Sequence, residues 1–161
     1  QFGKEIPNLT GFFALLLALL LLLPACAPDA GDSDARTLKR IGKALSLDLS
    51  AGTLERLENT HGGFHGDGRT AAEITLPGLA GTLADAPGWR PLPPSESMAQ
   101  ALRLCGMDTP PEAGFYYLYD RHSDSRDPYD DSLLHQRYSW NFTAAVYDSG
   151  AGRLYYYEFD T

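Results

Sequence analysis

The strongest constraint on the fold lies late in the sequence, where two strand-forming stretches flank a short turn. Residues 138–146 place Tyr, Trp, Phe, Ala and Val at every second position, the period of a strand with one buried face. The turn-forming run of residues 148–152 follows, and residues 154–159 form a second aromatic stretch. These segments predict an antiparallel hairpin in which Trp140 lies on the buried face and Asn141 on the opposite face.

Helices are predicted in three places. Apolar residues recur at helical spacing up to Leu45, and Asp34 is suited to cap the start of this helix. A short helix is predicted over residues 78–85. Ser95 is a good N-cap for a third helix, which Gly106 would end.

The remaining stretches add extended chain. Residues 53–60 and 69–76 flank a glycine-rich segment and predict a second hairpin. The aromatic residues 114–119 predict a further strand, whereas three prolines make residues 89–94 an extended linker. The order of elements predicts a single α+β domain over residues 37–161, with a mostly antiparallel sheet and two or three helices.

The N-terminal segment differs from the rest of the chain. Phe12 to Leu23 is an unbroken apolar run of twelve residues. As a helix it rises roughly 18 Å, too little to cross a hydrocarbon core of roughly 30 Å. That length suits a secretory signal. An uncleaved or differently cleaved signal and a buried core helix are the alternatives.

The apolar run is followed by Leu23-Pro24-Ala25-Cys26, which resembles the lipobox of bacterial lipoproteins. The resemblance implies a signal peptide over residues 1–25 and a lipid, such as palmitate, on Cys26. Residues 26–36 would then form the lipidated cysteine and a flexible tether. Cys105 would be the only remaining thiol, and we expect it to be buried and inert.

Charge excludes one class of partner. The chain has 21 acidic and 13 basic residues, a net charge of −8, so it lacks the basic stripe that binds nucleic acid. The expected partners are the membrane, through the lipid anchor at the extracytoplasmic face, and a protein or envelope ligand. No cofactor is expected.

The most unusual segment is the Gly/His loop, which we define as residues 61–68: His61-Gly62-Gly63-Phe64-His65-Gly66-Asp67-Gly68. Its glycines permit close backbone approach, but it lacks the Gly-Lys-Ser/Thr ending of a nucleotide-binding P-loop. A shaped hairpin loop is the simplest interpretation. A ligand-binding loop would use His61, Gly62, Gly63, His65 and Asp67. A Zn²⁺, Fe²⁺ or catalytic site would use its two imidazoles and its carboxylate, although no metal ligand can be assigned.

A second polar stretch carries five aspartates, and we predict that it is a solvated loop. They stand near Arg121, His122 and Arg126, and they are Asp120, Asp124, Asp127, Asp130 and Asp131. Calcium binding is disfavoured because the residue order of a Ca²⁺ loop is absent. The sequence contains neither a Ser-His-Asp spacing nor a Gly-x-Ser-x-Gly elbow that would indicate a hydrolase.

Several of these segments are similar to a group of small lipoproteins from Gram-positive gut bacteria. They are the Gly/His loop, Trp89-x-Pro-Leu-Pro, Gly114-Phe-Tyr-Tyr, Asp120-Arg, Asn141-Phe-Thr and Leu154-Tyr-Tyr-Tyr-Glu-Phe-Asp-Thr. The resemblance implies an anchored single domain and carries over no catalytic residue. We therefore expect a non-catalytic extracytoplasmic binding domain. The alternatives are a metal-dependent or hydrolytic enzyme that uses the Gly/His loop, and a structural accessory of a membrane complex.

Overall fold

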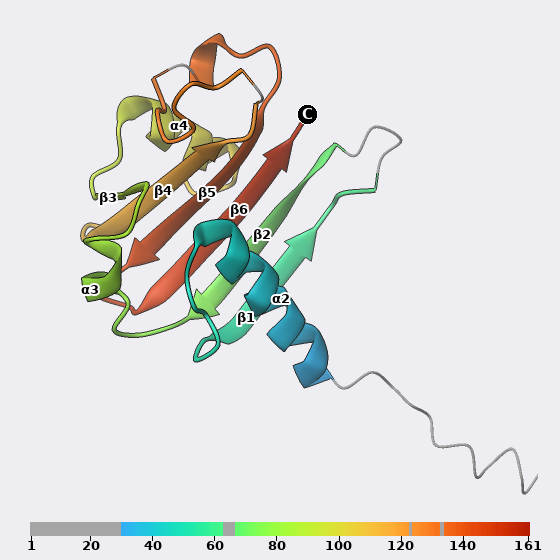
Figure 1. Cartoon of the computed structure of the whole chain (residues 1–161), viewed down its shortest axis with the longest axis vertical. Helices are drawn as coiled ribbons and strands as arrows, with labels where there is room; N and C mark the ends of the chain where they lie inside the picture. The colour runs from blue at the N-terminus through green and yellow to red at the C-terminus, as the bar shows by residue number, and fades with distance from the viewer. Residues whose placement is uncertain (1–29, 63–66, 123, 133) are drawn as a thin grey trace, which may run out of the picture. The chain divides into compact units, whose positions relative to one another are not determined.

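Six antiparallel strands form one sheet in the order β1-β2-β6-β5-β4-β3 (Figure 1). The computed structural model describes residues 30–62, 67–122, 124–132 and 134–161. The strands are β1 (Thr53–Asn59), β2 (Gly68–Thr75), β3 (Trp89–Pro91), β4 (Gly114–Asp120), β5 (Asn141–Asp148) and β6 (Arg153–Asp160). The helices are α2 (Ala30–Leu45), α3 (Ala80–Leu83), α4 (Glu96–Leu104) and the 3₁₀ helix η1 (Leu134–Gln136). The predicted α+β class with an antiparallel sheet is confirmed.

Helices pack on both faces of the sheet (Figure 1). On the α2 face, the apolar stripe of α2 packs with α3 against buried side chains of β2, β4, β5 and β6. On the α4 face, Met98 and Leu102 of α4 pack against β4, β5 and β6. The predicted α2 stripe is confirmed, since Leu38, Ile41 and Leu45 are all buried. The helix begins at Ala30, so Asp34 lies inside it and does not cap it.

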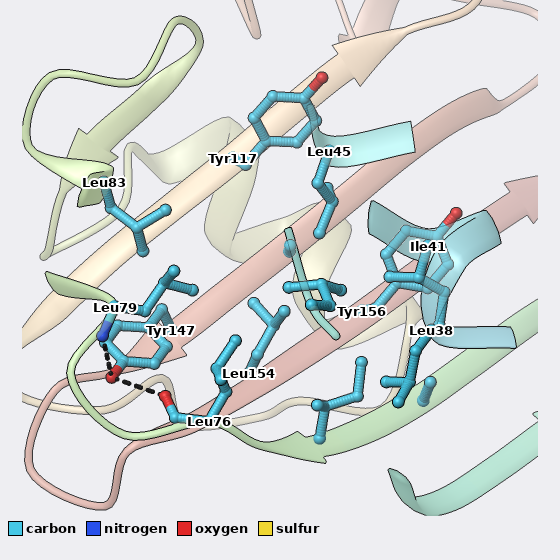
Figure 2. Packing of buried hydrophobic residues seen from close by; sticks show 14 of the residues in the cluster. Leu38, Ile41, Leu45, Leu76, Leu79, Leu83, Tyr117, Tyr147, Leu154 and Tyr156 are labelled. Carbon is cyan, nitrogen blue, oxygen red and sulfur yellow. Dashed lines mark hydrogen bonds between the residues drawn. The ribbon is translucent and has the colours of Figure 1, made fainter. Parts of the chain in front are cut away.

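A buried tyrosine ties the segment before α3 to the sheet. The Tyr147 hydroxyl accepts a hydrogen bond from the backbone N–H of Leu79 at 3.2 Å and donates one to the carbonyl of Leu76 at 3.1 Å. Figure 2 shows both bonds among the surrounding leucines. Because these backbone groups lie within the core, the hydroxyl satisfies polar atoms that burial would otherwise leave without partners.

The prediction of a single buried face for residues 138–146 was wrong. The strand β5 begins at Asn141. Phe142 belongs to the core on the α4 face, whereas Ala145 and Tyr147 belong to the core on the α2 face. Trp140 precedes the strand and is half-buried. Both faces of β5 are buried because different helices cover them. The alternation of residues within the strand does not indicate whether a helix from elsewhere in the chain covers the second face.

Two other predictions have different outcomes. Residues 89–91, expected within a linker, pair with β4 as a short edge strand, a position where Pro91 is tolerated. The predicted cap of α4 is confirmed, since the Ser95 side chain accepts a hydrogen bond from the Met98 N–H.

Within the described ranges, no helix combines the length and apolar character needed to cross a membrane.

Candidate functional site

Polar side chains gather at the end of the sheet where β1, β4 and β6 finish and β2 and β5 begin. Asp160 of β6 lies opposite Gly68 of β2 on one side and Asn141 of β5 on the other. The β2–β6 pairing therefore brings the Gly/His loop beside the end of β6. Distant parts of the sequence meet here because β6 lies between β2 and β5.

His61, the first residue of the Gly/His loop, is held by this end of the sheet. Its Nε2 lies 3.0 Å from Asp160 Oδ2, while its Nδ1 lies 3.0 Å from Asn59 Oδ1 and 3.3 Å from Thr70 Oγ1. Arg121 Nη2 donates to the other carboxylate oxygen of Asp160 at 2.6 Å. Both ring nitrogens of His61 thus have protein partners, and the Asp160 charge is balanced by a guanidinium.

Backbone bonds fix the stem of the Gly/His loop. The Thr60 N–H donates to the Arg69 carbonyl at 2.9 Å, and the Arg69 N–H donates to Thr60 Oγ1 at 2.9 Å. At Gly68, φ is +156°, and a Cβ would lie 2.7 Å from the His61 backbone. A side chain at that position would therefore collide with the backbone of Thr60 and His61, which follow β1.

The other predicted site residues are not gathered around His61. Gly62 and Asp67 are exposed, and Gly63 and His65 lie outside the described residues. Asp67 is one wall of a shallow hollow of about 360 Å³, whose other lining residues are Thr60, Gly68, Arg69, Phe159, Asp160 and Thr161. In the part of the chain that the structure describes, no three His, Cys, Asp or Glu residues form a cluster suited to a metal ion.

A second network, which we call the His122 network, consists of Asp120, His122, Arg137 and Ser139. His122 Nδ1 lies 2.7 Å from Asp120 Oδ1, and His122 Nε2 lies 3.2 Å from Ser139 Oγ. Arg137 Nη2 donates to Asp120 Oδ2 at 2.7 Å, and its Nη1 donates to Asp124 at 2.8 Å. Asp120 is only 4% exposed, so its charge is shielded from water and balanced within the protein.

Hydrogen bonding decides the ionisation of Asp120. Burial favours its neutral form, but hydrogen bonds from His122 and Arg137 outweigh burial and hold the pKa of this carboxyl below its usual value. The neighbouring Arg121 reaches Asp160 instead. Two consecutive residues at the end of β4 therefore support two separate networks.

The prediction of a solvated acidic loop holds for three of the five aspartates. Asp124, Asp127 and Asp130 are exposed, whereas Asp120 and Asp131 are buried. Asp131 accepts a hydrogen bond from Ser95 Oγ and lies 3.6 Å from Arg90 Nη1. Asp131 thus connects Ser95, the N-cap of α4, to the acidic stretch of residues 120–131. The prediction that Asp131 is solvated was wrong.

Burial has a different effect on Cys105. The thiol is buried at the end of α4, and desolvation raises its pKa to about 12. This environment agrees with the predicted inert cysteine, because a nucleophilic cysteine needs a lowered pKa.

Sequence reasoning missed the His122 network. The only local indication was the polar triplet Asp120-Arg121-His122 at the end of an aromatic strand, and nothing in the spacing pointed to Ser139, 17 residues beyond His122. Comparison of the chain with known protein families, curated proteins and solved structures finds no match.

Proposed function

We propose that this protein is a lipid-anchored domain at the extracytoplasmic face of the cell membrane, which binds a partner or envelope ligand through the Gly/His loop end of its sheet. The anchor rests on the sequence, and the location of the binding surface rests on the geometry of the described residues at the two ends of the loop. These two parts are tested separately.

The anchor is supported by the order of segments along the chain. The apolar run of residues 12–23 and the lipobox-like motif that ends at Cys26 come first. The compact unit that carries the sheet begins at Asp34, eight positions after Cys26. A lipid on Cys26 would thus be joined to the domain by a short stretch of chain.

The bonding of His61 is the observation that carries the binding proposal. A metal ligand or a general base needs a ring nitrogen free to meet a metal or a proton donor. Each nitrogen of His61 instead lies 3.0 Å from an oxygen that accepts hydrogen bonds, Asn59 Oδ1 or Asp160 Oδ2. His61 thus ties the start of the loop to the end of the sheet, which favours recognition by the loop over catalysis by it.

The hollow beside the loop supplies the chemistry for recognition. Its lining combines the ring of Phe159 with the charged groups of Asp67 and Arg69 and with threonine hydroxyls. Such a surface offers apolar contact and directional hydrogen bonds together, as ligand sites commonly do. A polar ligand with one apolar face fits this description.

Metabolic labelling with a palmitate analogue tests the anchor. The parent and Cys105→Ser should carry the label, and Cys26→Ser should lose it, because only Cys26 stands in the lipobox-like motif. The Cys105 variant is the matched control, since it removes the other cysteine. Equal labelling of Cys26→Ser and the parent would refute the anchor.

Pull-down from detergent-solubilised membranes tests the binding surface. Asp67→Arg reverses an exposed charge at the hollow, and Asp108→Arg reverses an exposed charge near the end of α4. Both protein and sugar in the bound material should be analysed. We expect Asp67→Arg to lose what the parent retains and Asp108→Arg to keep it. Equal recovery by the two variants would place the binding surface elsewhere.

A further inference from the structure

The His122 network has the connectivity of a nucleophile, a general base and a group that orients the base. Ser139 Oγ contacts Nε2 of His122 at 3.2 Å, and the opposite ring nitrogen contacts Asp120 Oδ1 at 2.7 Å. A serine nucleophile requires this order of contacts, whatever the fold or the chain order of the three residues. We propose that Ser139 is an acyl-accepting nucleophile that His122 activates and Asp120 positions, acting on small esters.

Asp120 determines which nitrogen of His122 can accept a proton. A carboxylate can only accept a hydrogen bond, so Nδ1 carries the hydrogen in this contact and Nε2 presents its lone pair to Ser139. The Asp120 carboxylate is itself held by Arg137 Nη2 at 2.7 Å and by the His122 backbone N–H at 3.1 Å. Asp120 is therefore a positioning residue. Its Oδ2, which does not contact His122, accepts a hydrogen bond from the Arg137 guanidinium.

The network runs from the interior toward the surface. The side chains of Asp120 and His122 are 4% and 10% exposed, Ser139 is partly exposed, and the preceding Tyr138 is 97% exposed. The base and its orienting group are thus shielded, while the nucleophile lies near water and near an accessible aromatic ring. A reacting group can approach Ser139 without opening the core.

A hollow adjoins the network on the side of Asp120 and Arg137. It shares Asp120 and Arg137 with the network and has a volume of about 280 Å³; its other lining residues are Asp124, Ser125, Arg126, Asp127 and Asp130. Its volume is just below the usual range of ligand sites, and most of its lining residues are charged. Because Ser139 and His122 do not line this hollow, the proposed substrate class rests on the chemistry of the serine hydroxyl and not on the hollow.

The reaction requires no oxidant, reductant or cofactor. Ser139 Oγ bonds to the ester carbonyl carbon while its proton moves to His122 Nε2. The bond between that carbon and the alcohol oxygen then breaks, and the alcohol departs with the proton from His122. Water attacks the acyl-serine by the same route, which releases the carboxylic acid and restores the Ser139 hydroxyl.

A fluorophosphonate probe tests the nucleophile directly, because the serine oxygen displaces fluoride and keeps the phosphonyl group. The full chain in detergent micelles should become labelled, and peptide mapping should place the label on Ser139. Ser139→Ala should abolish the label. Ser149→Ala is the matched control, since Ser149 is exposed in the turn between β5 and β6, and it should label like the parent.

His122→Gln should label at least about 100-fold more slowly than the parent, the usual range for losing a general base. Circular dichroism of each variant establishes that the fold is retained. Absence of label on Ser139 in the parent would overturn the proposal, and so would an unchanged labelling rate in folded His122→Gln. Neither result bears on the Gly/His loop, which uses other residues.

Asp120→Asn tests positioning with a readout that simple structural support would not change. Nitrogen NMR of the ring should show a protonated Nδ1 and a bare Nε2 for His122 in the parent. In Asp120→Asn this preference should be lost, and labelling of Ser139 should slow about as much as in His122→Gln. A parent ring with its proton on Nε2, or full labelling speed in folded Asp120→Asn, would contradict the assigned role.

Discussion

Tyr147→Phe removes one hydroxyl and two hydrogen bonds from the core on the α2 face while leaving the ring in place. Tyr147 is 1% exposed, and its two partners, the Leu79 N–H and the Leu76 carbonyl, belong to residues that are also buried. Each lost hydrogen bond costs about 1 kcal/mol, and a buried donor left without a partner costs about 1–3 kcal/mol. We therefore expect the free energy of unfolding to fall by about 2–3 kcal/mol.

Urea denaturation followed by circular dichroism measures this change. With an m value of roughly 1–3 kcal/mol/M, the midpoint should fall by roughly 1 M or more while m stays constant. Tyr119→Phe is the control, because Tyr119 is 37% exposed and its change should stay within about 0.5 kcal/mol. If the two variants unfold at the same urea concentration, the Tyr147 hydroxyl does not stabilise this segment as described.

Three further predictions follow from the core and the His122 network. Phe142→Ala should cost about 3–5 kcal/mol in urea melts and more than Trp140→Ala, since Phe142 is fully buried and Trp140 is not; the reverse order would contradict the described packing. The lowered pKa of Asp120 adds stability that is present above its unfolded value of about 3.9 and is lost as the pH falls through the folded pKa. The urea midpoint of the parent should thus fall between pH 6 and pH 3 by more than that of Asp120→Asn. An equal fall in the two proteins would show that Asp120 does not contribute to the pH dependence of stability. The Cys105 thiol, with a pKa of about 12, should resist iodoacetamide at pH 8 until urea is added, and rapid alkylation of the folded chain would count against its burial.

Local patterns predicted most elements because each depends on residues that are close in sequence. The apolar stripe of α2, the Ser95 cap of α4 and the two hairpins all rest on spacings of a few residues. The two buried faces of β5 could not be predicted in the same way. Its central pair Ala144-Ala145 is small and apolar on both sides, so alternation gives no contrast, and the covering helices come from distant segments.

The candidate site was predictable only in part for the same reason. The glycines and histidines of residues 61–68 marked the loop as unusual, but the partner of His61 is Asp160, 99 positions away. Their contact depends on the pairing of β2 with β6. These strands are far apart in the sequence, so no pattern of neighbouring residues predicts their pairing. The ion pair of Asp120 with Arg137 likewise joins residues 17 positions apart, and no short sequence spacing predicts it.

The central place of β6 also determines when the sheet can be completed. It follows the other five described strands along the chain, yet it joins the β1–β2 hairpin to the part of the sheet made by β5, β4 and β3. While residues 153–160 remain inside the ribosome, the two parts lack their shared neighbour, and an edge of each stays unpaired. For a chain that we propose to be exported, this order delays completion of the sheet until β6 has left the ribosome. Such a delay keeps the polypeptide unfolded enough to pass through a secretion channel. It also gives chaperones time to bind the chain before the sheet is complete.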